Sequence, residues 1–358
     1  KTLDARVPGL AKVVYHNKLG SQLDRVERVR AIAVWVAKQI GTDEDLADRA
    51  AYLAKADLLT DMVGEFPELQ GVMGGYYARE QGEHEWVAQA ISEQYVVRGQ
   101  ENVDPANHIS EVLQIADRME TLVGIWGIGL KPTGDKDPFA LRRHALSVIS
   151  SLQFLGPIAE SNVGKPGLEL EGLLEFVVSK FPPELLERTV VEEVRRFIYE
   201  RSSNQLKQMF NAETVAAVFA NVPPLHEVVK RIYAVRDFQR LPESQSLAAA
   251  NKRVGNILKK AESEVGSTAD PARFVEAAEK ALFATLSDTA PRADAAFESG
   301  DYTASLQTLA ALKAPVDAFF DNVMVNADDP ALRANRLALL NQLHQTMNRV
   351  ADISKLAA

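Results

Sequence analysis

The sequence contains no cysteine and no long apolar segment. The absence of cysteine among 358 residues excludes disulfide bonds, cysteine-ligated zinc and thiol catalysis, and it fits a reducing, cytoplasmic location. No apolar run approaches the roughly 20 residues that a membrane-spanning helix needs, so we expect no membrane partner. The first residue is Lys rather than Met, and we expect a fragment or a processed product of a longer chain.

Histidine is scarce, and the common catalytic motifs are missing. The six histidines never occur at HxxH or HxxxH spacing, which would place two metal ligands on one helical face. The chain has neither a GxxxxGK[S/T] nor a GxGxxG phosphate loop, and no serine stands in a nucleophile-elbow context. We therefore predict no catalytic residue and no metal site.

Positive charge is also in deficit. The formal net charge is −9 at pH 7, and the excess acidity lies mostly in residues 1–160. This balance argues against a general nucleic-acid binder, and we expect no DNA partner. A local RNA site is still possible, but it would have to be built from clustered basic side chains.

Apolar residues repeat at helical spacing through most of the chain, whereas the alternation of apolar and polar residues that is typical of β-strands is absent. The clearest examples are residues 23–40 and 109–126. The sequence therefore predicts an all-α fold. The length allows two or three domains, and we predict three parts: 1–160, 161–238 and 239–358. The first boundary is placed in the Gly- and Pro-rich segment 156–172, which is expected to be a loop.

The segment KADLLTDMVGEFPELQG (55–71) predicts a buried corner between helices. Pro67 disfavours helical geometry at Phe66, so the helix that passes through Ala50 should end near Gly64. We expect Gly64 to have a positive φ or close packing.

This segment and two others carry a family resemblance. The other two are GLKPTGDKDPFALRR (129–143) and AAANKRVGNILKK (248–260). The three blocks resemble the β subunit of the bacterial heterotetrameric glycyl-tRNA synthetase, and the likeness extends from about residue 13 to about residue 356. The resemblance implies that the chain is the C-terminal half of that subunit.

The family resemblance also implies a function. In that family an α2β2 enzyme joins glycine to tRNA-Gly with the use of ATP, and the α subunit carries the active site. This chain would then bind and position tRNA, as a subunit of a glycine-tRNA ligase that is not catalytic alone. The implied partners are tRNA-Gly and the α subunit; ATP and Mg²⁺ would be used at the α subunit, with no cofactor in this chain.

The first part resembles an HD-type helical domain in the order of its helices. A working HD phosphohydrolase holds metal through His, an adjacent His-Asp pair and a distal Asp. Here the adjacent pair falls on Ala54 and Lys55, and only Asp117 fits the distal Asp. One carboxylate cannot hold a catalytic divalent metal, so we predict a degenerate HD-like domain over 1–160. An active HD phosphohydrolase is the alternative.

The block at 248–260 predicts a basic helix face. The candidate tRNA-binding residues on it are Lys252, Arg253, Asn256, Lys259 and Lys260. Lysines can contact phosphates, and an Asn amide can read base edges. The alternative is an ordinary solvated face. The segments 315–325 and 328–340 resemble a DALR-type anticodon-binding helical bundle, which favours tRNA contact over 239–358.

A second candidate site lies at a predicted junction between a loop and a helix. Lys131, Arg142 and Arg143 could bind phosphate there, or they could form ion pairs with Asp135 and Asp137. Asp137 with the following proline predicts the helix start. A chain without any tRNA affinity would instead be a non-catalytic helical interaction scaffold.

Overall fold

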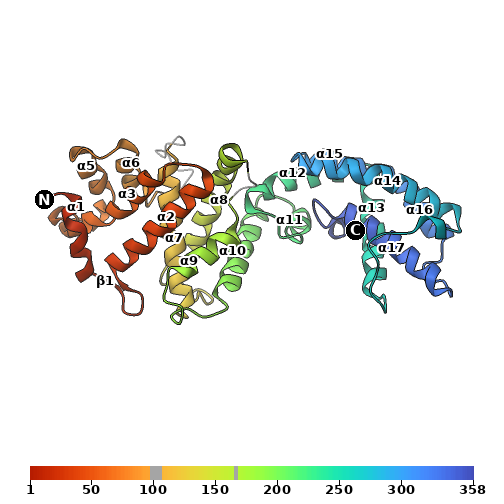
Figure 1. The fold of residues 1–358 in the computed structure, drawn as a ribbon, viewed down its shortest axis with the longest axis horizontal. Coiled ribbons are helices and arrows are strands. Elements are labelled where there is room, and N and C mark those ends of the chain that lie inside the picture. Colours follow the sequence, from red (N-terminus) through yellow and green to blue (C-terminus); the bar gives the residue numbers. More distant parts are fainter. Residues whose placement is uncertain (97–106, 165–167) are drawn as a thin grey trace. The chain divides into compact units, whose positions relative to one another are not determined.

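The computed structural model describes residues 1–96, 107–164 and 168–358, and helices dominate it (Figure 1). In these ranges the only strands are β1 (Val14–His16) and β2 (Gly20–Ser21), which form a small antiparallel hairpin. The predicted all-α class is confirmed. None of the described helices is both long enough and apolar enough to cross a membrane.

The chain separates into two compact units. The N-terminal unit comprises residues 1–202 with 224–226, and the C-terminal unit comprises 203–223 with 227–358. The three-part division 1–160, 161–238 and 239–358 stays a prediction.

The N-terminal unit is built around one buried helix, α7 (His108–Gly127), in which every residue after His108 is buried. Helices α2, α6, α8 and α9 pack around it. Because α7 is covered on all sides, its polar side chains, among them Glu111, Asp117 and Glu120, are buried as well. The other elements are α1 (Leu3–Arg6), η1 (Val7–Lys12), α2 (Gln22–Ile40), α3 (Glu44–Leu53), η2 (Ala56–Leu59), α4 (Asp61–Glu65), η3 (Pro67–Leu69), α5 (Val72–Glu80), α6 (Glu85–Glu93), α8 (Leu141–Val163), α9 (Leu170–Ser179) and most of α10 (Val190–Leu206).

The C-terminal unit is a bundle whose centre includes the fully buried rings of Phe238 and Phe319. Helix α13 packs against α16, α17 and η7, and α14 packs against α15, α16 and α17. Its elements are α11 (Ala212–Phe219), α12 (Val228–Gln239), which follows η4 (Leu225–Glu227), α13 (Ser244–Lys259), η5 (Pro271–Arg273), α14 (Ala277–Glu298), α15 (Tyr302–Thr308), η6 (Leu309–Leu312), α16 (Lys313–Asn322), α17 (Pro330–Met347) and η7 (Ile353–Leu356).

The corner at 55–71 differs from its prediction. Helix α3 ends at Leu53, and a separate short helix, α4, contains Gly64. The expectation for Gly64 is wrong, because this glycine is exposed and a Cβ added to it would meet no atom within 4 Å. The glycine with positive φ is Gly71, at +83°. The buried carboxylate of Asp57 fixes this corner by accepting the Gly71 and Gly74 N–H groups at 2.7 and 3.0 Å.

Both ends of α8 also differ from expectation. Helix α8 begins at Leu141 rather than beside Asp137, whose carboxylate accepts the N–H groups of Leu141 and Arg142 at 2.8 and 2.9 Å. The same helix continues to residue 163 through Pro157, so residues 156–163 are not a loop. Helix α13 ends at Lys259. Residues 277–298 form one helix through Pro291, because packing against three neighbouring helices outweighs the hydrogen bond that proline removes.

Candidate functional site

Helix α13 carries the predicted basic face. Leu247, Ala248 and Val254 are buried and hold the helix in the bundle. The side-chain amides of Asn251 and Asn348 form a reciprocal pair of hydrogen bonds at 2.7 and 2.8 Å, which attaches α13 to the end of α17. The opposite face is left to solvent, so its basic side chains are presented on a rigid support.

Three of the predicted residues line a hollow of about 500 Å³. Lys252, Asn256 and Lys259 are exposed and lie on one side of α13, at spacings of four and three residues. The facing wall includes His344 of α17, Lys355 of η7 and one acidic residue, Asp352, the N-cap of η7. We call this the α13 hollow. Gly255 keeps its floor open, because a Cβ added there would first meet His344 Nε2, at 3.7 Å.

The lysines of the α13 hollow are free of acidic partners. Within the described residues, no carboxylate lies within 4.0 Å of the ammonium groups of Lys252, Lys259 or Lys355. Partial burial lowers the pKa of His344; Asp352 opposes this effect and Lys259 adds to it. The imidazole is therefore neutral at physiological pH, and the three lysines supply the positive charge. An unpaired cluster of this kind can accept an anion such as an RNA phosphate.

The remaining two predicted residues of α13 lie outside the hollow. The guanidinium carbon of Arg253 lies 4.2 Å from the ring centroid of Phe320, in a cation–π contact with α16. Lys260 is exposed and forms the C-cap of the helix. The five residues are therefore presented in two directions rather than as one continuous stripe.

The second predicted site, at Lys131, Arg142 and Arg143, is held by internal contacts. The Lys131 ammonium lies 2.8 Å from a carboxylate oxygen of Glu187 and 2.8 Å from one of Glu193. The predicted alternative, in which Lys131 forms ion pairs with Asp135 and Asp137, is therefore wrong. Hydrogen bonds from Lys131, Trp126 and Thr189 lower the pKa of Glu193 to about 2.

The two arginines of this junction do not join Lys131. Arg142 donates to the Gly134 carbonyl at 2.6 Å, whereas Arg143 is exposed. Only Arg143 is left readily available to a phosphate, so the junction is a weaker candidate than the α13 hollow.

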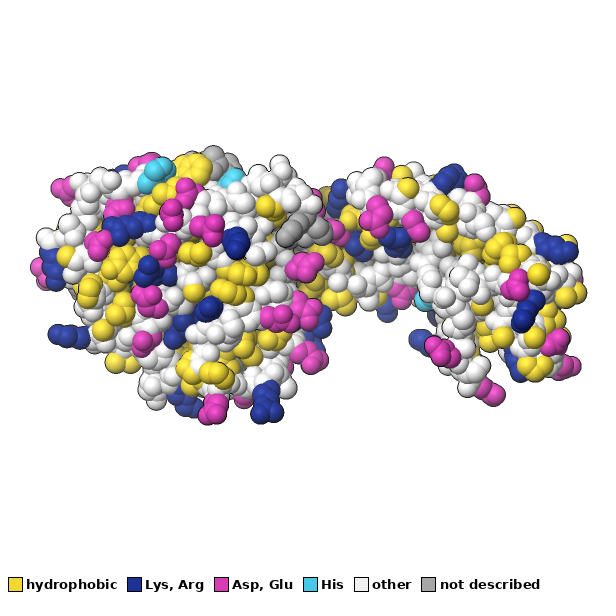
Figure 2. Space-filling model, viewed as in Figure 1, with side chains coloured by type: hydrophobic (Ala, Val, Ile, Leu, Met, Phe, Trp, Pro, Cys, Tyr) yellow, Lys and Arg dark blue, Asp and Glu magenta, His cyan; other side chains and the backbone are white. Residues whose placement is uncertain are grey.

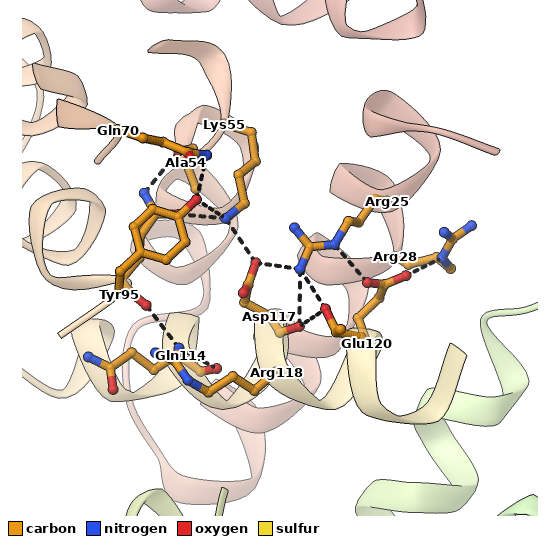
Figure 3. A network of polar contacts seen from close by, with 12 residues as sticks. Arg25, Arg28, Ala54, Lys55, Gln70, Tyr95, Gln114, Asp117, Arg118 and Glu120 are labelled. Atoms are coloured by element: carbon orange, nitrogen blue, oxygen red, sulfur yellow. Dashed lines mark hydrogen bonds and ion pairs between the residues drawn. The ribbon is translucent and has the colours of Figure 1, made fainter. Parts of the chain in front are cut away.

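Asp117 lies in a buried ionic network that Figure 3 shows from close by. Its carboxylate is 3.0 Å from the Arg25 guanidinium and 3.1 Å from the Lys55 ammonium. Lys55 also donates to the Tyr95 hydroxyl at 2.6 Å and to the side-chain amide oxygen of Gln94 at 2.8 Å. One helical turn further along α7, Glu120 pairs with Arg25 at 2.9 Å.

This network determines what the Asp117 carboxylate can bind. Burial by itself would raise the pKa of Asp117, but Arg25 and Lys55 hold it well below its usual range. The carboxylate is ionised, and it is already neutralised by two cations. A divalent metal beside it would be repelled by both, and Ala54 next to Lys55 offers no side-chain ligand.

Sequence reasoning did not identify Lys355 and His344 as members of a site. Both lie about 90 residues or more beyond the α13 residues that they face, and neither stands in a motif. The segment DISKLAA (352–358) around Lys355 carries no local pattern that singles this lysine out. On the face of the molecule in Figure 2, basic and acidic side chains are interspersed, which agrees with local rather than broad positive charge.

Comparison with known families shows which family the chain belongs to. Residues 1–220, more than half of the chain, match the family described as glycyl-tRNA synthetase beta subunit. The chain belongs to this family. Residues 247–356 match the DALR anticodon binding domain, and this range contains all the lining residues of the α13 hollow named above.

Close relatives carry the name of the same subunit. The glycine–tRNA ligase beta subunits of Thiobacillus denitrificans, Delftia acidovorans and Methylobacillus flagellatus are 59%, 55% and 52% identical to this chain. Each alignment covers 100% of this chain and 50% of the relative. The chain thus spans about half the length of the curated relatives it matches.

Proposed function

We propose that this chain is the part of a glycyl-tRNA synthetase β subunit that binds and positions tRNA-Gly. It would support ATP-dependent joining of glycine to tRNA-Gly in an α2β2 cytoplasmic enzyme. The α subunit would bind ATP and Mg²⁺ and carry out the chemistry, and this chain alone would not activate glycine. The family membership and the names of the relatives support this proposal.

The observation that carries the proposal is the α13 hollow. It is a concave site with three unpaired lysines, within a chain of net charge −9 and within the range that matches an anticodon-binding domain. Local positive charge in an acidic protein selects a particular polyanion contact rather than general nucleic-acid binding. We assign Lys252, Lys259 and Lys355 to phosphate contacts.

Asn256 has a different proposed role. Its amide both donates and accepts hydrogen bonds, which allows it to read the edge of an unpaired base, whereas an ammonium group cannot distinguish bases in this way. Asn256 is exposed at the wall of the hollow between Lys252 and Lys259. A base held there would be read while its phosphate is bound by the lysines.

A charge-reversal series tests the site. Lys252→Glu, Lys259→Glu and Lys355→Glu are compared with Lys280→Glu, which changes an exposed lysine of α14 outside the hollow. Binding of tRNA-Gly and of a non-cognate tRNA is titrated at several salt concentrations. Each hollow variant should weaken binding and lower the salt slope by about 1, because each lost phosphate contact releases about one counterion fewer. Lys280→Glu should bind like the parent.

The Asn256→Ala variant completes the series. It should reduce discrimination between the two tRNAs more than it reduces affinity for either at low salt. If the three lysine variants bind like the parent with the same slope, the RNA site is elsewhere, and the exposed Arg143 would be the next residue to test.

The rival hydrolase function is opposed by the surroundings of Asp117. We infer that an HD-like domain in this chain serves as a scaffold. The Asp117 carboxylate, which a metal would require as a ligand, is already neutralised by Lys55 and Arg25. Stoichiometric manganese, iron or zinc, with a phosphatase activity lost in Asp117→Ala, would contradict this inference.

A further inference from the structure

A second hollow in the C-terminal unit lies between the start of α11 and the outer face of α12. It measures about 330 Å³, and its lining includes Phe210, Asn211, Thr214, Arg236, Gln239 and Arg240. None of these residues belongs to the α13 hollow or to the predicted tRNA-binding set. We call it the α12 hollow.

One aromatic ring, that of Phe210, lines this hollow, and the ring of Tyr233 lies next to it. The Phe210 and Tyr233 rings pack edge to face, with centroids 5.5 Å apart. Tyr233 is 44% exposed although it sits on a helix that buries its other face in the bundle. An aromatic ring left this open offers a flat surface on which a planar group can stack.

Cationic groups stand beside the exposed ring. The guanidinium carbon of Arg236 lies 4.6 Å from the Tyr233 centroid, and among the described residues no carboxylate is within ion-pair distance of Arg236. Arg240 is 3.5 Å from Asp237, with a side chain that is 71% exposed. The hollow therefore has one arginine stacked on the tyrosine and a second that is only loosely paired.

Amide groups provide the polar lining. The Gln239 Oε1 atom accepts a hydrogen bond from Thr214 Oγ1 at 3.0 Å, and Asn211 Oδ1 accepts the Glu213 and Thr214 N–H groups at 2.9 and 3.2 Å. Both amide oxygens are thus used to fix the two side chains. Their NH₂ groups remain as oriented donors that a carbonyl or ring nitrogen of a base can accept from.

We propose that the α12 hollow binds one unpaired RNA nucleotide, with its base against Tyr233 and Phe210 and its phosphate at Arg236 and Arg240. Stacking on aromatic side chains combined with arginine contacts is how proteins hold single-stranded RNA. A duplex cannot use this site, since its bases are stacked inside the helix. The inference deepens the proposed RNA-binding function and rests on it, but it uses residues separate from the α13 hollow.

The test uses the 358-residue chain and a fluorescein-labelled hexauridylate, with a blunt RNA duplex as the comparison probe. Tyr233→Ala should weaken hexauridylate binding about tenfold, because one base–aromatic stack is lost. Tyr233→Phe should retain binding, because the ring remains. Arg236→Gln should weaken binding and reduce the salt slope by about 0.7. Duplex binding should change little in all three.

Matched controls separate this site from general surface effects. Tyr76 is 61% exposed in the N-terminal unit, and Arg292 is an exposed arginine of α14. Tyr76→Ala and Arg292→Gln should both bind hexauridylate like the parent. A hexamer containing 4-thiouridine should cross-link under light to the peptide that carries Tyr233, and Tyr233→Ala should remove that cross-link. Unchanged melting temperatures in the variants show that the fold is retained.

The outcomes distinguish this inference from the proposed function. If Tyr233→Ala leaves hexauridylate affinity and the cross-link unchanged while Lys259→Glu weakens tRNA binding, the α12 hollow is not an RNA site and the proposed function stands. If Tyr233→Ala weakens the hexamer while Lys259→Glu changes nothing, the α12 hollow is the RNA site and the α13 assignment is wrong.

Discussion

Lys55 shows how one residue can change what a buried carboxylate does. A buried charge is tolerated only when it is paired, and the Asp117 carboxylate has Lys55 at 3.1 Å and Arg25 at 3.0 Å. Lys55 also lies against Tyr95, with its nitrogen 4.4 Å from the ring centroid. The lysine therefore ties α7 to the segment after α3 at a position where a metal site would demand an anion.

Removing this lysine should destabilise the fold. Lys55→Met keeps the length of the side chain but leaves Asp117 with Arg25 alone, and we expect a loss of roughly 2–3 kcal/mol at pH 7. Lys12→Met, at an exposed lysine, is the control and should change stability by less than about 0.5 kcal/mol. Urea unfolding of both variants measures the difference; equal midpoints would show that the pair contributes nothing.

The same network predicts how stability depends on pH. The folded-state pKa of Asp117 is lowered, so its contribution is fully present above the unfolded value of about 3.9 and is lost as the pH falls towards the folded value. The difference in unfolding free energy between the parent and Lys55→Met should therefore be constant between pH 5 and 8 and shrink below about pH 4. A difference that grows on acidification would contradict this assignment.

The glycines of the 55–71 corner make a matched pair. Gly71 has a φ of +83°, and a Cβ there would lie 3.2 Å from the Ile91 carbonyl oxygen. Gly71→Ala should thus cost about 1–3 kcal/mol. Gly64→Ala should range from no change to a gain of about 0.5 kcal/mol, since its surroundings are open. Thermal melts of the two variants decide whether Gly71 or Gly64 holds the corner.

Two clearly periodic helices, α2 and α7, could be predicted from sequence almost to the residue. Helix α2 follows the expected 23–40 run and ends at Gly41, whose φ of +72° forms the C-cap. Helix α7 follows the expected 109–126 run and begins after Asn107, which caps it with its side chain. In both cases the apolar period and the capping residue indicate the same boundary.

Proline misled the prediction where packing was stronger than the local preference. Pro157 lies inside α8, in a segment predicted to be a loop, and Pro291 likewise lies inside α14. A proline removes one hydrogen bond from a helix, a local cost that long-range packing can exceed. That packing depends on residues far away in the sequence, so it could not be read from the segment itself. The same reason explains why Lys131 pairs with Glu187 and Glu193 rather than with nearby aspartates.

Helix α13 allows the shape of its hollow to be tested separately from its charge. Gly255→Leu would fill the hollow without changing any charge, since only His344 Nε2 lies near a new Cβ, at 3.7 Å. We expect tRNA-Gly binding to weaken while the salt slope stays that of the parent, because the substitution removes no basic side chain that contacts phosphate. Gel-shift titrations over several salt concentrations measure both quantities.

Gly255→Ala is the matched control for this experiment. A methyl group leaves most of the hollow open, and alanine favours the helix by about 1 kcal/mol, so binding should persist and the melting temperature should rise slightly. If Gly255→Leu binds like Gly255→Ala, the lysines act as an open surface and the hollow has no role.

Long-range folding brings the pieces of the α13 hollow together. Lys252 and Lys259 could be found from one helical block, but Lys355 comes from the end of the chain. Spacing within a sequence indicates which residues share a helix face, and it does not indicate which distant turn will face them. The predicted basic face was accordingly incomplete, and its Arg253 packs on the ring of Phe320 instead of lining the hollow.

The balance of charge over the chain leads to the final prediction. The three unpaired lysines of the α13 hollow stand in a molecule of net charge −9, so few phosphate contacts are available and the acidic remainder repels a polyanion. The logarithm of the tRNA association constant should fall against the logarithm of salt concentration with a slope of about −2 to −4, far shallower than for proteins that bind with 6–10 contacts. Because phosphate contacts carry no sequence information, tRNA-Gly and a non-cognate tRNA should give the same slope and differ only in affinity. A filter-binding titration of both tRNAs measures this, and a steeper slope for tRNA-Gly alone would mean that recognition itself depends on phosphate contacts outside the α13 hollow.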